Sequence, residues 1–441
     1  MKILEASTTI TQRHSPTLDE SVWSATLDCG LHLIFAPRPG FAGNFGVFTT
    51  RYGSMHSRWQ EGKSSRTLPD GVAHFLEHQL FKKKRGDLSD EFASTGAYVN
   101  AQTSHTSTSY FFDGAAQFET NLDLLLELCL TPHFDQKSVD LEREIIIQEI
   151  KSYRDQPYWV NYQRLLEALY HEHPVRRDIA GDEDSVSHIG PKLLGECHER
   201  FYQPSNCSLI VSGDFDAFDL VDLANRLCNK HLASGYGKRK RAPMPSPQKL
   251  REPAGVRVKR EERAMYTPQP NLMIGFKDSA ILSGVELLQR ETALRVALDV
   301  LFGASSACFE ELYDEGLIAG DFGTSAHIEP SFCYIMIGGE TPEPDELEAR
   351  IDARITTALK EGFDPVELRR KARKAAGRML SAFHSPEATA FTHLSGWLGG
   401  YDPFTAIDFV ESLTADDMVR VARECFKPNG RAVSLIKCAG A

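Results

Sequence analysis

The same order of secondary-structure patterns occurs twice along this chain of 441 residues, and this repeat limits the possible folds more than any other feature. In each half, two alternating apolar segments typical of strands precede a segment with the i, i+3, i+4 spacing typical of a helix. Two more strand patterns and two more helical patterns follow. This order predicts a duplicated α+β unit in which helices cover a mostly antiparallel sheet.

The predicted elements fall at similar places in the two halves. In the first half, strands are expected at 30–38, 44–53, 97–103 and 107–115, and helices from about residue 70, at 118–130 and at 138–153. In the second half, strands are expected at 256–260, 271–277, 321–329 and 332–340, and helices at 285–302, 345–361 and 366–383.

A basic and proline-rich segment, residues 235–255, separates the two halves. Its composition cannot propagate a helix or hold a central strand, so we expect a semi-extended linker. The linker divides the chain into an N-terminal domain, residues 1–234, and a C-terminal domain of the same fold, residues 256–441.

Charge and hydrophobicity exclude several classes of function. The chain has 49 Lys and Arg residues against 61 Asp and Glu residues, a formal net charge of −12. Because nucleic-acid binding requires a positive surface, we expect no nucleic-acid partner. No stretch approaches the roughly 18–20 apolar residues of a membrane span. The N-terminus shows no apolar signal-peptide core, so we expect a cytoplasmic protein without a membrane partner.

The nine cysteines are scattered along the chain and form no CxxC or other short metal-ligand spacing. A disulfide framework or a cysteine-based zinc site is therefore not expected. Buried free thiols in a reducing compartment are the simplest interpretation.

The residues that carry chemistry are concentrated at 71–78, Gly-Val-Ala-His-Phe-Leu-Glu-His. On a helix, positions i, i+3 and i+4 share a face, so His74 and His78 can direct both imidazoles at one metal ion. Glu77 then lies between them, close enough to hydrogen-bond to a water on that ion. Asp70 is the expected N-cap of this helix. The arrangement H-x-x-E-H is the inverse of H-E-x-x-H and is the signature of the inverzincins.

A tetrahedral catalytic zinc needs a third protein ligand and keeps its fourth position for water. The helix predicted at 138–153 offers Glu142 and Glu149, which are two turns apart and share one face. One carboxylate can bind the metal while the other orients a histidine ring from behind. The spacing alone leaves open which glutamate has which role.

These motifs resemble the pitrilysin/insulinase family of zinc peptidases, peptidase family M16. The resemblance covers most of the chain and is strongest to the short bacterial members similar to mitochondrial processing peptidase. It rests on residues 71–78, Asn100 and Ala101 with Thr103, residues 106–110, Glu142 and Arg143 with 148–150, His173 and Pro174, Gly181, and residues 202–206.

The resemblance implies that His74, His78 and Glu149 bind one Zn²⁺ per chain, that Glu77 is the general base and that Glu142 supports the site from behind. It also implies two homologous ferredoxin-like subdomains of the LuxS/metallohydrolase-like type. The implied activity is hydrolysis of peptide bonds in unfolded peptides or small precursor proteins.

One departure from the family pattern bears on activity. Members that complete the site from a second half carry an Arg and a Tyr that hold the substrate carbonyl, whereas the matching positions here are Tyr313 and Gly320. Two hypotheses follow. The chain is either a peptidase, as a homodimer or as a heterodimer with a related non-catalytic chain, or a peptide-binding or maturation accessory subunit. In the second hypothesis, activity needs a partner that supplies the missing pair.

A position for the substrate is expected next to the histidine helix. The segment 97–102 alternates weakly, as an edge strand does, and a peptide can add to such an edge through main-chain hydrogen bonds. Together with the resemblance, this makes Asn100, Ala101 and Gln102 the candidate substrate-binding residues. An ordinary internal strand is the alternative interpretation.

Overall fold

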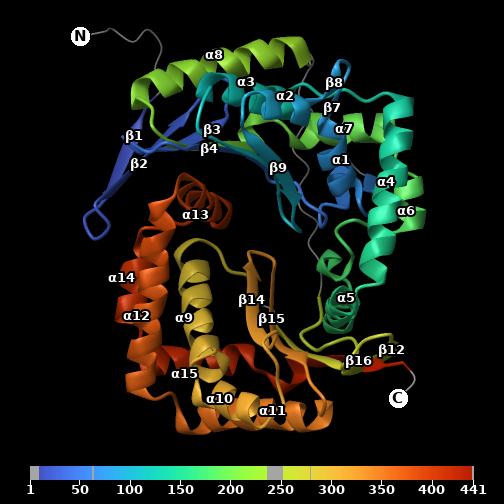
Figure 1. The fold of residues 1–441 in the computed structure, drawn as a ribbon, viewed down its shortest axis with the longest axis vertical. Coiled ribbons are helices and arrows are strands. Elements are labelled where there is room, and N and C mark those ends of the chain that lie inside the picture. The colour runs from blue at the N-terminus through green and yellow to red at the C-terminus, as the bar shows by residue number, and fades with distance from the viewer. Residues whose placement is uncertain (1–8, 62–63, 236–251, 279, 440–441) are drawn as a thin grey trace. The chain divides into compact units, whose positions relative to one another are not determined.

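The computed structural model describes residues 9–61, 64–235, 252–278 and 280–439, and the chain forms two compact units. The first unit comprises residues 1–150, 178–248 and 382–398, and the second comprises residues 151–177, 249–381 and 399–441. Of the predicted linker, 235–255, residues 236–251 lie outside the described part of the chain. Figure 1 shows the elements of both units.

The first unit contains a seven-stranded sheet in the order β1-β2-β3-β11-β4-β10-β9. β3 and β11 are parallel, and every other neighbouring pair is antiparallel. The central strands β4 and β11 are buried along their whole length. The strands are β1 (Thr11–Ser15), β2 (Glu20–Thr26), β3 (His32–Pro37), β4 (Asn44–Thr50), β9 (Tyr98–Thr103), β10 (Thr108–Gly114) and β11 (Cys207–Gly213).

Helices cover both faces of this sheet. On one face, α1, α3, α7 and α8 enclose the main apolar core. On the other face, α13 places Ala390 and Leu394 against Phe45, Val47 and Ile210. The helices are α1 (Val72–Leu80), α2 (Leu88–Ser94), α3 (Phe118–Leu130), α4 (Gln136–Arg154), α6 (Glu183–Ser187), α7 (Pro191–Phe201), α8 (Ala217–Gly235) and α13 (Pro386–Gly399). Two short hairpins complete the unit, β5 (Arg58–Glu61) with β6 (Ser64–Thr67) and β7 (Lys82–Lys83) with β8 (Gly86–Asp87).

The second unit repeats this topology with five strands, in the order β12-β16-β13-β15-β14. β12 and β16 are parallel and the other pairs are antiparallel, as in the series β3-β11-β4-β10-β9. The predicted duplicated α+β fold is therefore confirmed, although the strand predicted at 256–260 begins only at its last residue. The strands are β12 (Arg260–Met265), β13 (Asn271–Asp278), β14 (Gly323–Glu329), β15 (Phe332–Glu340) and β16 (Arg431–Cys438).

Helices also cover both faces of the second sheet. One face packs against α9, α11, α12 and α15 around a continuous apolar core. On the other face, α5 packs against β13, where the Asn161 side-chain amide donates to the Asn271 carbonyl at 2.7 Å. Leu165 of α5 lies over Gly275, so a Cβ at that glycine would approach Leu165 Cδ1 to 2.9 Å. The helices are α5 (Pro157–Leu169), α9 (Gly284–Phe302), α10 (Ala307–Asp314), α11 (Pro344–Glu361), α12 (Pro365–Ser381), α14 (Thr405–Ser412) and α15 (Ala415–Cys425).

The two halves of the sequence exchange one helix each. Helix α5 comes from the first half but packs on the second sheet, and α13 comes from the second half but packs on the first sheet. The compact units are therefore interleaved in sequence, whereas the predicted domains were two continuous stretches. A sheet whose second face is also apolar needs such a cover, and the alternation within its strands does not say which helix provides it.

Two expectations about burial can be compared with the structure. None of the nine cysteines, all of which the structure describes, forms a disulfide bond, and they are buried except for Cys29 and Cys438, which are partly exposed. One region, residues 284–314, is by length and composition apolar enough to cross a membrane, so the expectation that no stretch approaches a membrane span is wrong. In the structure, 61% of its most apolar window is buried, as in the core helix of a folded domain.

Candidate metal centre and active site

Helix α1, which carries both histidines, starts at a glycine. Gly71 is the N-cap, with a left-handed φ of 89°, and no side chain caps the helix. The prediction of Asp70 as the N-cap is therefore wrong. A Cβ at Gly71 would lie 2.3 Å from the Ala180 carbonyl oxygen, so only glycine permits this close backbone approach. Backbone packing fixes the start of the helix here.

The structure brings the three predicted metal ligands together. His74 and His78 of α1 and Glu149 of α4 each offer one donor atom, and these atoms all lie within 4.8 Å of one another. Glu149 Oε2 is 3.8 Å from His74 Nε2 and 3.6 Å from His78 Nε2. Zinc bonds of about 2.0–2.1 Å in a tetrahedron place ligand atoms about 3.3–3.4 Å apart, so the observed spacings are close to those of a zinc site.

Glu142 lies behind this group rather than in it. His78 Nδ1 is 2.9 Å from Glu142 Oε1, and an ionised carboxylate can only accept, so Nδ1 carries the proton. The lone pair of His78 Nε2 is then free for a metal ion. The sequence spacing left open which glutamate has which role. In the structure, Glu149 lies with the metal donors, and Glu142 hydrogen-bonds to the His78 ring. Two imidazoles and one carboxylate also form a ligand set used by catalytic zinc.

Burial and neighbouring charges prepare these groups differently. Burial, together with repulsion from His78, lowers the pKa of His74 to about 3, so its imidazole is neutral, the form that binds metals. Burial alone would raise the pKa of Glu142, but the hydrogen bond from His78 and the charge of Lys82 lower it. Glu142 therefore remains an acceptor at neutral pH.

Glu77, the predicted general base, is held by Thr103, which the sequence motifs include but to which no role was given. The Glu77 side chain is buried, and burial raises its pKa, although a hydrogen bond from Thr103 opposes this shift. Thr103 Oγ1 donates to Glu77 Oε2 from the end of β9. Thr103 is two residues after Ala101 and therefore on the same face of the strand. This two-residue periodicity was the sequence signal that could have drawn attention to Thr103.

The predicted substrate strand is an edge strand. Among the strands that the structure describes, β9 pairs with β10 alone, so the alternative of an internal strand is wrong. Asn100 and Gln102 are exposed on one face, and Ala101 is half-buried on the other. The side-chain amide of Asn100 donates to the Tyr98 hydroxyl at 2.6 Å.

The two positions that depart from the family pattern lie in the second unit. Tyr313 is on α10, with 56% of its surface exposed, and its ring stacks on Phe309. Gly320 lies in the turn that precedes β14. Neither offers a cationic group for a substrate carbonyl.

Comparison with known protein families gives matches to both parts of the chain. The model described as "Insulinase (Peptidase family M16)" matches residues 65–183, which include the three donors and Glu77. The model described as "Peptidase M16 inactive domain" matches residues 189–374.

Curated proteins similar to the chain include two zinc proteases. The chain is 36% identical over 416 residues to zinc protease YmfH of Bacillus subtilis, covering 92% of this chain and 94% of that protein. It is 25% identical over 438 residues to zinc protease PqqE of Helicobacter pylori, covering 94% of this chain and 92% of that protein.

A solved structure shows the same fold over nearly the whole length. An M16-like peptidase from Alicyclobacillus acidocaldarius matches with a TM-score of 0.88 at 29% identity, covering 99% of this chain and all of that one. The family models match more than half of the chain, and a relative at 36% identity covers almost all of it. The chain therefore belongs to peptidase family M16, the insulinase family.

Proposed function

We propose that this chain is a zinc peptidase that hydrolyses peptide bonds in unfolded peptides or small precursor proteins. The observation that carries the proposal is the convergence of His74, His78 and Glu149, with donor atoms within 4.8 Å of one another, beside a buried glutamate. The relatives that are called zinc proteases support it.

The residues divide the work of hydrolysis. A zinc ion held by the three donors would act as a Lewis acid and lower the pKa of a water from 15.7 towards about 7. Glu77 takes the proton from the attacking water and returns it to the leaving amine. Thr103 holds Glu77 Oε2, so Oε1 would be the oxygen that accepts the proton from the water. Glu142 keeps His78 in the tautomer that binds metal.

Substrate binding at the edge of β9 explains the expected preference for unfolded chains. An extended peptide placed beside Asn100, Ala101 and Gln102 would gain its affinity from main-chain hydrogen bonds. Such binding depends little on side chains, and a folded protein has no free strand to offer.

The absent Arg/Tyr pair supports a second candidate function. Because Tyr313 and Gly320 supply no such pair, the chain in this alternative is a peptide-binding or maturation subunit that works with a related chain. If the chain is instead the proposed peptidase, it is one half of a homodimer or heterodimer.

Zinc content and peptide cleavage test these proposals together. We expect about one zinc per chain by emission spectroscopy, and cleavage of a fluorogenic peptide library that a chelator abolishes and added zinc restores. Cleavage by the chain alone supports a self-sufficient peptidase, and cleavage only after mixing with a related chain supports the heterodimer. Zinc without cleavage in either case supports the accessory subunit. A purified chain that takes up no zinc contradicts the proposed peptidase.

A further inference from the structure

We propose that Lys82 is a positioning residue of the metal centre that acts through Glu142, and that the hairpin of β7 and β8 holds it in place. This inference rests on the proposed function and deepens it. Lys82 is the first residue of a basic run, Lys-Lys-Lys-Arg at 82–85, that begins two residues after α1 ends. The histidine helix therefore continues almost directly into this run.

The carboxylate of Glu142 has a different partner on each oxygen. Oε1 accepts the hydrogen bond from His78 at 2.9 Å, and Oε2 is 3.5 Å from Lys82 Nζ. The Glu142 side chain is only 5% exposed, so water provides little alternative solvation for Oε2. A buried carboxylate without a countercharge is costly, and Lys82 is the cation that faces this one. Its ammonium group keeps the carboxylate plane turned so that Oε1 meets His78.

The β7–β8 hairpin fixes the position of the Lys82 ammonium. Lys82 and Asp87 are opposite each other in the two strands, and Lys82 Nζ is 2.8 Å from Asp87 Oδ2. The other oxygen of Asp87 accepts from the Ser89 amide at 2.9 Å and so caps α2. The ammonium group therefore lies between two fixed carboxylates, one on the hairpin and Glu142 on α4.

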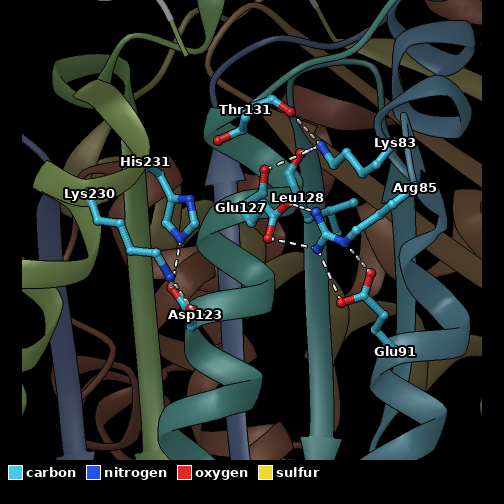
Figure 2. A network of polar contacts seen from close by, with 9 residues as sticks. All are labelled: Lys83, Arg85, Glu91, Asp123, Glu127, Leu128, Thr131, Lys230 and His231. Carbon is cyan, nitrogen blue, oxygen red and sulfur yellow. Dashed lines mark hydrogen bonds and ion pairs between the residues drawn. The ribbon is translucent and has the colours of Figure 1, made fainter. Parts of the chain in front are cut away.

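The neighbouring residues anchor the hairpin to the rest of the unit, as Figure 2 shows. Lys83 is buried and donates to three backbone carbonyls at the C-terminal end of α3. Arg85 lies between Glu91 of α2 and Glu127 of α3 and pairs with both. Successive strand residues point to opposite faces, so the anchoring of Lys83 directs Lys82 towards Glu142. The carbonyls that Lys83 meets are those of Glu127, Leu128 and Thr131, at 3.2, 3.1 and 2.6 Å.

Zinc affinity separates this role from that of an ordinary surface ion pair. The full chain, with K82M, K82R or K84M, is titrated with zinc in competition with a chromophoric chelator, and its rate of zinc loss is measured. We expect K82M to bind zinc about 10–100-fold more weakly, the usual effect of removing a group that supports a metal ligand. K82R keeps the charge and should remain close to the wild type. Lys84, exposed in the same hairpin, is the matched control, and K84M should have no effect.

A double-mutant cycle with E142Q tests the route of the effect. If Lys82 acts through Glu142, K82M causes no further loss of zinc affinity in the E142Q background. K82M with wild-type affinity, or an equal loss in both backgrounds, would overturn the inference. Melting of the metal-free variants by circular dichroism serves as the folding control. If K82M does not fold, loss of affinity in a folded K82R overturns the inference equally, because that variant keeps the charge. A wild-type chain that binds no zinc overturns the proposed function itself and this inference with it.

Discussion

The two units share one five-stranded topology but use the corresponding helix pair in different ways. In the first unit, two histidines of α1 face a glutamate of α4 and leave a space that suits a metal ion. In the second unit, α9 and α12 occupy the same places in the element order. There, Lys371 of α12 is buried and lies 3.2 Å from Asp299 of α9. Among the described residues, the second unit has no group of metal donors of this kind.

This difference shows that the fold only brings two helices together. In the second unit an ion pair occupies the contact between them, and the nearby Lys374 adds a second cation to Asp299 at 2.8 Å. In the first unit the three donors, His74, His78 and Glu149, include no permanent cation, and Lys82 pairs with Glu142 behind them, so the imidazoles can be neutral. The site therefore depends on a few side chains placed on a shared scaffold, as function generally does.

The largest effect should come from the base on α1. E77Q keeps the shape of the side chain but cannot take a proton, so the cleavage rate should fall about 10²–10⁴-fold while zinc content is unchanged. E291Q, at a partly buried glutamate of the counterpart helix α9, should leave the rate within about 2-fold, because that helix makes no metal site. Initial rates on a fluorogenic peptide give both values. Unimpaired cleavage by E77Q would remove Glu77 from the mechanism.

The exchanged helices provide the next test. Leu165 of α5 and Leu394 of α13 are both buried, so L165A and L394A should each lower the free energy of unfolding by about 2–5 kcal/mol. Amide hydrogen exchange should show that each substitution loosens strands from the half of the sequence to which the substituted helix does not belong. L165A should speed exchange in β13, and L394A should speed exchange in β4 and β11.

Y266A is the matched control, since Tyr266 is 94% exposed and its removal should change stability by no more than about 0.5 kcal/mol. If L165A instead loosened β4, helix α5 would belong to the half from which it comes in sequence. The interleaved units would then be wrong.

Thr103 links the edge strand to the base, and its removal should have a smaller effect than loss of the base. T103V keeps the shape but loses the hydrogen bond to Glu77, which as a bond to a charged group is worth about 1.5–3 kcal/mol. We expect kcat to fall about 10–100-fold with little change in KM or in zinc content, and T103S to restore most of the rate. A rise in KM with unchanged kcat, seen in T103S as well, would instead make Thr103 a substrate contact.

Much of the fold and the metal ligands could be predicted because they rest on short periodicities. His74 and His78 are one helical turn apart and Glu142 and Glu149 are two, so their shared faces follow from helix geometry. The first-half strands at β3, β4, β9 and β10 follow from alternation. The central strand β11 was missed because its apolar residues form a short continuous run rather than an alternation, and such a run does not distinguish a strand from a buried helix segment.

The rest depends on contacts between residues far apart in the sequence. The hydrogen bond from Thr103 to Glu77 joins a strand end to a helix. Strand alternation places Thr103 on the same face as Ala101, but it does not pair Thr103 with Glu77. The N-cap at Gly71 depends on the backbone near Ala180, more than a hundred residues away. The positions of α5 and α13 depend on which apolar helix face meets which sheet. The amino-acid composition would be the same whichever sheet each helix covers.

Several buried histidines should make the first unit sensitive to acid, and substitution can isolate the contribution of one of them, His198. Burial lowers the pKa of His198 to about 3, with the Cys129 carbonyl, 2.7 Å from its Nε2, opposing the shift. Between pH 6.5 and about 3 the unfolded chain therefore binds a proton here that the folded chain excludes. The free energy of unfolding should fall by about 1.4 kcal/mol per pH unit from this residue as the pH is lowered, and no stability is lost through it above pH 6.5.

H198Q can keep the donor to Cys129 but cannot take up the proton, so its stability should fall less steeply with acid by about that amount. Urea unfolding from pH 7.5 to 4.5, with a chelator present so that metal loss does not contribute, measures the difference between the two slopes. In the second unit, burial likewise lowers the pKa of His173 to about 4, so H173Q should flatten the same curve. Equal slopes for H198Q and the wild type below pH 6.5 would mean that His198 is protonated in the folded state. A difference that persists above pH 6.5 would indicate lost packing against Tyr202 and not lost proton uptake, because His198 stacks on that ring at 4.5 Å.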